Sequence, residues 1–316
     1  MGFDTLLGND RLKENLNNAL GKGRASHFYL LSGAPGSGRH TLAMLLSAAL
    51  QCRGAEKPCL TCPQCRKVMA RTHPDVTVVE DPEHVTLPIK LVRDARADAS
   101  VKPNEGNRKI YIFPQELGIP GQNAMLKLLE EPPAYGTFLV LTDNPEKLLP
   151  TLRSRCVELK LQSLKPEVLR PALSQRFPKA TAQDVEAAIN RSGGYLGQAI
   201  TLLQNKNRRT PEADGFARVM GSRNTLELLQ LLAPMEKWKR EKLIDCLTDW
   251  LSLTQEALVC RSGLPALDST ARDLSLARNP ADLMRTAQIL KKAIEYTQGN
   301  VSPAAVCGWL EWALRS

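Results

Sequence analysis

The chain has 316 residues, of which 43% are hydrophobic and 24% are charged. This composition supports two or three packed domains and excludes a wholly disordered protein. The net charge of +9, from 42 basic and 33 acidic residues, permits contact with a polyanion such as DNA but does not establish it. No run of 18 apolar residues and no secretory signal pattern is present, so we expect a cytoplasmic protein without a membrane span.

The chain opens with a helix, a strand and a glycine-rich loop. Apolar residues at helical spacing predict the helix within 5–22, and the apolar run over 27–32 predicts a short buried strand. The loop 33–41 reads Gly-Ala-Pro-Gly-Ser-Gly-Arg-His-Thr, and a helix is predicted over 42–50. Strand, glycine loop and helix form the context of the phosphate-binding motif G-x-x-x-x-G-K-[ST].

The loop keeps the glycines of this motif but lacks two of its functional side chains. Arg39 stands where the motif has lysine, His40 stands where it has the hydroxyl that holds Mg²⁺, and Thr41 comes one position too late. Backbone N–H groups of the loop can still surround an anion ahead of a helix. The glycines that allow this are Gly33, Gly36 and Gly38. The pattern indicates a relative of an ATPase family that has lost catalytic groups.

A cluster of cysteines interrupts the α/β pattern. Four of the eight cysteines follow the spacing C-x6-C-x2-C-x2-C, at Cys52, Cys59, Cys62 and Cys65. Two close pairs that converge on one point suit a closed, structural Zn²⁺ site with four thiolate ligands. The alternative is a set of free buried thiols. His73 lies nearby as a potential competitor, but four sulfurs already fill the coordination shell. The four scattered cysteines are expected to be small core residues.

Strands and helices alternate along the next part of the chain. Strands are predicted over 76–79, 109–113, 137–142 and 156–159. Helices are predicted over 89–99 and 123–131, and two prolines stop the second of these. The alternation predicts an α/β domain with a parallel sheet and helices on both faces.

No acidic pair follows the strand predicted over 109–113, which is the third strand of the chain. An ATPase needs such a pair there to hold Mg²⁺ and orient water, whereas Pro114 and Gln115 follow this strand. Glu116 is interpreted as a solvated surface glutamate. Arg153 and Arg155 come before the last strand, and from composition alone they are interpreted as a surface arginine pair rather than as phosphate ligands.

Beyond residue 162 the sequence is helical throughout. We expect three domains, covering residues 1–162, 163–207 and 208–316, with a polar linker near 205–211. Trp309 and Trp312 share one face of the last helix. They are interpreted as core or helix-packing residues, with a subunit interface as the alternative.

Several stretches together resemble the clamp-loader branch of the AAA+ ATPases. The most specific runs from Asn-Ala-Met-Leu-Lys-Leu-Leu-Glu-Glu-Pro-Pro at 123–133, through 141–150, to Ser-Arg-Cys at 154–156. Gly8-Asn9 and 27–30 are similar to the N-terminal signature of that branch. His-Pro-Asp at 73–75 and Gly-Tyr-Leu-Gly-Gln-Ala at 194–199 resemble its stator subunits more than its gamma/tau motor subunits. The resemblance covers roughly residues 3–203.

The resemblance implies an AAA+ nucleotide-binding-like domain with a zinc module at 52–65, a helical lid and a helical collar. It implies a subunit that helps load the sliding clamp onto primed DNA within DNA polymerase III, in a hetero-pentamer with delta and gamma/tau subunits. Arg155 takes the position of an arginine finger acting in trans, and Thr142 the position of sensor 1. The chain's own site is then degenerate, with no sensor-2 arginine at Gly197, so that ATP hydrolysis by this chain alone is not expected and ATP or ADP binding is left open. The residues of that site are Gly33, Gly36, Gly38, Arg39, Thr41 and Thr142.

Two other functions are compatible with parts of the pattern. One is an active gamma/tau-like ATPase that tolerates Arg39, against which stand His40 and the missing acidic pair. The other is a stand-alone zinc-containing DNA-binding protein, which would bind DNA with strong salt dependence and without partners.

Overall fold

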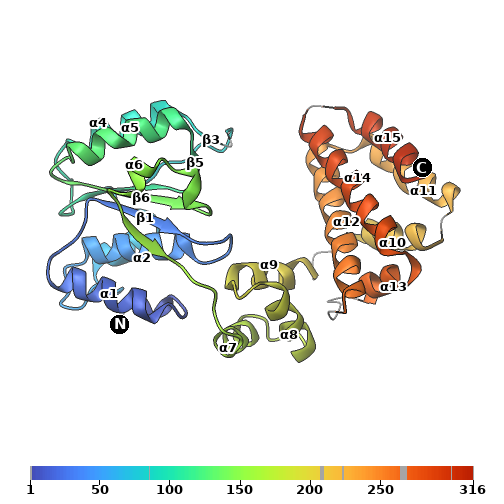
Figure 1. The fold of residues 1–316 in the computed structure, drawn as a ribbon, viewed down its shortest axis with the longest axis horizontal. Coiled ribbons are helices and arrows are strands. Elements are labelled where there is room, and N and C mark those ends of the chain that lie inside the picture. Colours follow the sequence, from blue (N-terminus) through green and yellow to red (C-terminus); the bar gives the residue numbers. More distant parts are fainter. Residues whose placement is uncertain are drawn as a thin grey trace. The chain divides into compact units, whose positions relative to one another are not determined.

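The computed structural model describes residues 2–84, 86–206, 210–222, 224–263, 269–299 and 301–315 (Figure 1). The chain forms two compact units, Met1–Pro171 with Gly193–Gln198, and Ala172–Ser192 with Ala199–Ser316. Each unit has its own buried hydrophobic residues. The three domains expected from the sequence stay a prediction.

A five-stranded parallel sheet, in the order β2-β4-β6-β1-β7, forms the centre of the first unit. The register places Ser32 opposite Thr142 and Tyr29 opposite Val157. Every residue of β1 and of β4 is buried, as expected for parallel strands covered on both faces. The strands are β1 (Phe28–Ser32), β2 (Val76–Val78), β4 (Lys109–Phe113), β6 (Gly136–Thr142) and β7 (Val157–Lys160).

Helices cover both faces of this sheet (Figure 1). Successive strand side chains point to opposite faces, so Leu31 packs in one core and Leu30 in the other. Leu31 shares its core with α1 (Asp10–Gly21), α2 (Arg39–Gln51) and α3 (Pro63–Met69). Leu30 shares its core with α4 (Ile89–Ala99), α5 (Ile119–Glu130) and α6 (Pro150–Arg153). The predicted α/β fold with a parallel sheet and helices on both faces is therefore confirmed.

Some short elements differ from the prediction. Residues Gly2–Thr5 form a 3-10 turn (η1), and the first α-helix begins only at Asp10. A second small sheet pairs β3 (Thr86–Leu87) with β5 (Glu116–Leu117), and a 3-10 turn η2 (Pro145–Lys147) precedes α6. These segments are too short to show a periodic pattern in the sequence.

The rest of the described chain is helical, as predicted, and no strand follows β7 in it. Phe216 stacks on Trp250 in the core of the second unit, with ring centroids 4.4 Å apart. Trp309 packs edge-on against Tyr296, whereas Trp312 is 67% exposed. The elements are α7 (Pro166–Arg176), α8 (Ala182–Arg191), α9 (Leu196–Lys206), α10 (Pro211–Ser222), α11 (Thr225–Leu232), η3 (Ala233–Lys237), α12 (Arg240–Arg261), α13 (Ser269–Ala277), α14 (Pro280–Gln298) and α15 (Pro303–Arg315).

Among the described residues, every helix is either too short or too polar to cross a membrane.

Candidate nucleotide and metal sites

The glycine loop connects the end of β1 to the start of α2, as the motif requires. Gly36 and Gly38 have φ angles of 78° and 98°, in the left-handed region that favours glycine. The N–H of Gly33 donates to the carbonyl oxygen of Thr142 at 3.3 Å, which fixes the loop to the end of the neighbouring strand β6. The hydroxyl of Ser37 is buried and has no hydrogen-bond partner within the described residues, so one polar group of the loop stays available.

The first turn of α9 lies directly against this loop. The N–H of Gly197 donates to the carbonyl oxygen of Gly36 at 2.9 Å, and Nε2 of Gln198 donates to the carbonyl oxygen of Pro35 at 2.9 Å. A Cβ atom on Gly197 would lie 2.7 Å from Cα of Gly36, and one on Gly36 would lie 2.6 Å from the backbone nitrogen of Gln198. The two backbones therefore touch at a distance that only glycine allows at both positions.

The side chains that follow the glycines differ in exposure. Arg39 is half-buried; burial lowers the pKa of its guanidinium, and the negative charge of Asp143 opposes that shift. His40 and Thr41 are exposed. Partial desolvation, together with the positive charges of Arg39 and Arg71, lowers the pKa of His40 and favours its neutral form.

Thr142 lies beside the glycine loop, at the end of β6. Its Oγ1 donates to the carbonyl oxygen of Asn144 at 3.0 Å and accepts from the N–H of Asn144 at 3.2 Å. The structure thus brings Thr142 to the loop, with its hydroxyl already engaged in the turn that follows the strand.

The residues after β4 are engaged in structural contacts. Oε1 of Gln115 accepts from the N–H of Asp81 at 2.8 Å, and its Nε2 donates to the carbonyl oxygens of Asp81 and His84. Glu116 forms a 3.1 Å ion pair with Lys147, and both side chains are about half exposed. Gln115 therefore ties two loops together, and Glu116 has the surface environment expected from the sequence.

Arg155 and the glycine loop lie at opposite ends of the parallel strands. Arg155 comes two residues before Val157, which pairs with Tyr29 at the beginning of β1, whereas the loop follows Ser32 at the end of β1. The side chain is exposed, and its Nη1 donates to the carbonyl oxygen of Thr151 at 3.0 Å. The parallel register therefore keeps Arg155 away from this chain's own loop.

Gln122 is a buried polar residue that sequence reasoning missed. Its Nε2 donates to the carbonyl oxygens of Leu117 at 2.8 Å and Lys147 at 3.2 Å, and its Oε1 accepts from the N–H of Leu149 at 2.8 Å. Leu149 is the N-cap of α6, the helix that precedes Arg155. Gln122 therefore fixes the segment that carries Arg155, and a polar residue on the inward face of α5 was the signal that could have revealed it.

The four clustered cysteines converge as predicted. Their sulfur atoms all lie within 4.8 Å of one another, and Sγ of Cys59 is 4.0 Å from Sγ of Cys65. Four thiolates at about 2.3 Å from one Zn²⁺ are separated by about 3.8 Å, so the cluster fits a tetrahedral metal ion with a small contraction. The cysteines are not joined by disulfides. This arrangement can hold a metal ion.

Backbone N–H groups point at the sulfur atoms. Sγ of Cys52 accepts from the N–H groups of Gly54 and Cys59, Sγ of Cys59 from that of Cys62, and Sγ of Cys62 from that of Cys65, at 3.3–3.4 Å. Hydrogen bonds from the Thr61 side chain and from backbone N–H groups lower the pKa of Cys59 to about 5, whereas burial raises the pKa of Cys65. Donors of this kind favour the thiolate form that a metal requires.

His73 is not a fifth ligand. Its Nε2 is 2.7 Å from Oε1 of Gln64, and its Nδ1 accepts from the N–H of Asp75 at 3.0 Å. Both ring nitrogens are therefore used, and the sequence-based alternative of His73 as a competing ligand is not supported by the geometry.

The comparisons with known proteins match subunits of DNA polymerase III. A family model described as DNA polymerase III, delta subunit, matches residues 8–165. The chain is 32% identical to DNA polymerase III subunit delta' of Escherichia coli, over 88% of this chain and 86% of that protein. It is 30% identical to subunit delta' of Bacillus subtilis, over 66% and 62%, and 33% identical to subunit tau of Salmonella typhimurium, over 54% and 27%. The chain thus spans less than two thirds of the last two relatives.

Proposed function

The chain belongs to the delta-prime family of DNA polymerase III clamp-loader subunits, and from this premise we propose that it is a stator that hydrolyses no ATP and lends Arg155 to a neighbouring ATPase subunit. The observation that carries this proposal is the separation of two features: the glycine loop follows the end of β1, whereas Arg155 lies near the beginning of β1. The chain's own loop packs against the start of α9 and lacks the lysine and the hydroxyl of the motif, while Arg155 lies exposed near the opposite ends of the strands.

The proposal that this chain hydrolyses no ATP is based on the catalytic side chains that its glycine loop and the end of β4 lack. The loop offers Arg39 in place of lysine and His40 in place of a hydroxyl, and the residues after β4 are bound to other partners. Phosphoryl transfer depends on Mg²⁺ and on an oriented water, which these side chains do not provide. Gly197 carries no side chain that could contact a phosphate. Weak binding of a phosphate or of ADP by the loop backbone stays compatible with this proposal.

The role of Arg155 rests on its access to a neighbour. An arginine finger neutralises the charge that develops on the transferred phosphoryl group and contributes about 10³–10⁵ to the rate in related chemistry. A finger must be exposed in the free subunit and held by a rigid base. Arg155 is exposed, and the segment before it is fixed through the buried amide of Gln122.

The proposed partners are the delta and gamma/tau subunits in a five-subunit ring, with the sliding clamp and primed DNA as the targets of the complex. Large apolar side chains exposed on the C-terminal helices support an assembly surface there. These include Leu226, Met284 and Trp312, which are 63%, 56% and 67% exposed. The cysteine cluster is proposed to hold one structural Zn²⁺ and to take no part in chemistry, because four sulfurs fill the coordination shell.

The test combines two measurements on the full chain. Mixed with delta and gamma/tau subunits and weighed by native mass spectrometry, the chain is expected to enter a five-subunit complex. Alone, it is expected to show no steady-state ATP hydrolysis above background. Hydrolysis by the isolated chain that disappears in Arg39→Ala would instead establish a gamma/tau-like motor. Salt-dependent DNA binding without assembly would establish a stand-alone DNA-binding protein.

A further inference from the structure

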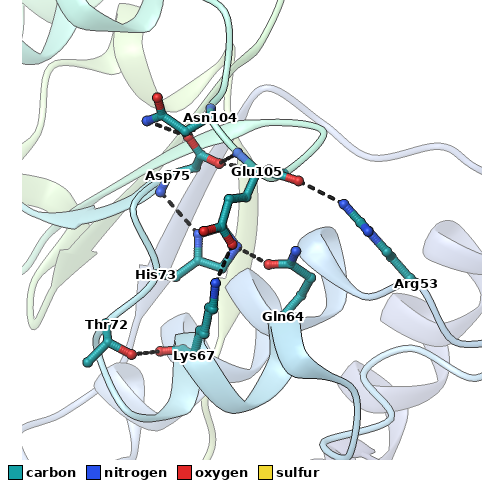
Figure 2. Close-up of polar contacts among 9 residues, drawn as sticks. Arg53, Gln64, Lys67, Thr72, His73, Asp75, Asn104 and Glu105 are labelled. Atoms are coloured by element: carbon teal, nitrogen blue, oxygen red, sulfur yellow. Dashed lines mark hydrogen bonds and ion pairs between the residues drawn. The ribbon is translucent and has the colours of Figure 1, made fainter.

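The cysteine cluster has two arms, residues 51–53 around Cys52 and residues 59–67 around the other three cysteines. One loop contacts both arms, and Figure 2 shows Arg53 and Lys67 bound to its residue Glu105. This is the loop 104–108, which leads into β4. On the side of Cys52, Nε2 of Gln51 donates to the carbonyl oxygen of Arg108 at 2.5 Å, and Oε1 of Gln51 accepts from the N–H of Asn107 at 3.2 Å. Nη2 of Arg53 donates to the carbonyl oxygen of Glu105 at 2.9 Å. The two residues that flank Cys52 thus both bind the loop 104–108.

The other arm of the cluster reaches the same loop through His73. Gln64 lies between Cys62 and Cys65, and its buried side chain accepts a hydrogen bond from Nε2 of His73 (Figure 2). Because Nδ1 of His73 accepts from the N–H of Asp75, the proton must reside on Nε2, and the ring is held neutral with one defined tautomer. Lys67, two residues after Cys65, forms an ion pair with Glu105 of the loop.

Asp75 links His73 to the loop 104–108, because its N–H binds His73 and its carboxylate binds the loop. Its Oδ1 accepts from the N–H of Asn104 at 2.7 Å, and its Oδ2 accepts from the N–H of Glu105 at 2.8 Å (Figure 2). Its Oδ2 also accepts from the N–H of Gly106 at 2.7 Å. Asp75 is only 2% exposed. Burial alone raises the pKa of this carboxyl group, but the three backbone donors outweigh that effect, so its pKa lies below the usual range and the group stays ionised.

We propose that His73 and Asp75 are positioning residues of the metal site, which hold Gln64 and the loop 104–108 as a brace across its two arms. The brace keeps the four sulfurs close together before a metal ion binds, and metal binding in turn stabilises the loop 104–108. The second effect follows from the first, because coupling between two binding events is reciprocal. This inference rests on the proposed Zn²⁺ site.

The first test measures zinc affinity in the full chain, by competition with a chromophoric chelator. Asp75→Asn keeps the shape of the side chain but replaces one carboxylate oxygen by a donor that cannot accept the loop N–H groups. We expect zinc to bind about 10- to 100-fold more weakly in this variant, the range seen when partners that orient metal ligands are removed. With Co²⁺ in place of Zn²⁺, we expect a weaker sulfur-to-metal charge-transfer band at equal metal concentration.

The matched control is Asp98→Asn. Asp98 also holds the start of β4, through Nζ of Lys109 at 2.7 Å and the hydroxyl of Tyr111. Among the residues that the structure describes, it has no hydrogen bond to the loop 104–108 or to residues beside the cysteines. We expect this variant to lose stability without loss of zinc affinity. An equal loss of affinity in both variants, or none in Asp75→Asn, would overturn the positioning role.

A second measurement needs no variant and decides the matter if Asp75→Asn does not fold. Hydrogen exchange of the N–H groups at 104–106 is compared in the wild-type chain with zinc bound and after chelation. We expect faster exchange without zinc at these positions, with little change at Gly136 in β6. Unchanged exchange at 104–106 overturns the brace. Failure of the wild-type chain to bind zinc at all refutes the metal site itself, and the two failures are therefore distinguishable.

Discussion

The backbone N–H of Gly197 donates a 2.9 Å hydrogen bond to the carbonyl oxygen of Gly36, at the centre of the phosphate-binding loop. The start of α9 therefore contacts the loop through its carbonyl oxygens, whereas an anion would be held by the N–H groups of the loop. Both residues are glycine because a Cβ atom on either one would collide with backbone atoms of the other segment.

Gly197→Ala should destabilise this contact. The new Cβ would lie 2.7 Å from Cα of Gly36, and backbone atoms cannot move aside cheaply, so we expect a loss of about 1–3 kcal/mol in unfolding free energy. Thermal unfolding monitored by circular dichroism measures it. Gly308→Ala is the control, because nothing lies within 4 Å of a Cβ at that helical position, and alanine should be neutral or slightly stabilising there. Equal melting temperatures for the two variants would contradict the close contact.

Arg155→Ala should leave the fold intact and slow ATP turnover of the reconstituted complex. The side chain is exposed and makes one hydrogen bond, to the carbonyl oxygen of Thr151, so its loss should change stability by less than about 0.5 kcal/mol. The ATPase site that receives this arginine should lose about 10³-fold or more in rate. Arg153→Ala removes a neighbouring cation that is paired with Glu146 at 2.8 Å, and it should keep the wild-type turnover. Unchanged turnover in Arg155→Ala would exclude the finger.

Gln122→Ala should destabilise the segment before Arg155. It leaves the carbonyl oxygens of Leu117 and Lys147 and the N–H of Leu149 without their side-chain partner in a buried place. A buried group left unsatisfied costs about 1–3 kcal/mol. Urea unfolding gives the difference, with Asn123→Ala on the exposed face of the same helix as the control. A loss no larger than that of the control would show that the amide is dispensable.

Zinc removal should lower the melting temperature. A ligand at 1,000 times its Kd stabilises a fold by about 4 kcal/mol, which corresponds to a shift on the order of 10 °C. Cys62→Ser should reproduce the effect of chelation, because it removes one of four ligands. Cys156→Ser, at a partly buried cysteine outside the cluster, should retain zinc and respond to chelation like the wild type. Elemental analysis that finds no zinc in the purified protein would refute the site.

The buried His73 should make stability depend on pH near neutrality. Burial lowers its pKa, and the positive charge of Lys67 adds to this, while the negative charges of Asp75 and Glu105 oppose it. Between the lowered folded pKa and the unfolded value of about 6.5, the unfolded chain binds a proton that the folded chain does not. Stability is therefore fully present above pH 6.5 and decreases as the pH falls through that value. His73→Asn, whose side-chain oxygen can accept from the N–H of Asp75 but does not titrate, should show a flatter profile between pH 7.5 and 5.5 in urea unfolding. Parallel profiles for the two proteins would contradict this origin.

Local patterns in the sequence were enough for much of the architecture. The apolar runs at Phe28–Ser32 and Lys109–Phe113 predicted two buried strands, because a buried parallel strand needs apolar side chains on both faces. The two-residue strands β3 and β5 were missed because a pair of residues has no periodicity. Gln122 was missed for a different reason. Its partners come from three separate segments, and one polar residue on an apolar helix face does not identify them.

The sequence by itself determined the fold class, the family, the four cysteines and the loss of the lysine and hydroxyl from the glycine loop. Each of these depends on residue type and on spacing within a short stretch of chain. Only the tertiary structure decided that Gln198 and Gly197 contact the loop, although Gln198 and Pro35 lie 163 residues apart, and that Arg155 lies near the beginning of β1 while the loop follows its end. It alone decided that the loop 104–108 contacts residues beside the cysteines. Contacts between distant segments follow from how helices pack on a shared sheet and from the register of its strands, and no short stretch of sequence specifies either one.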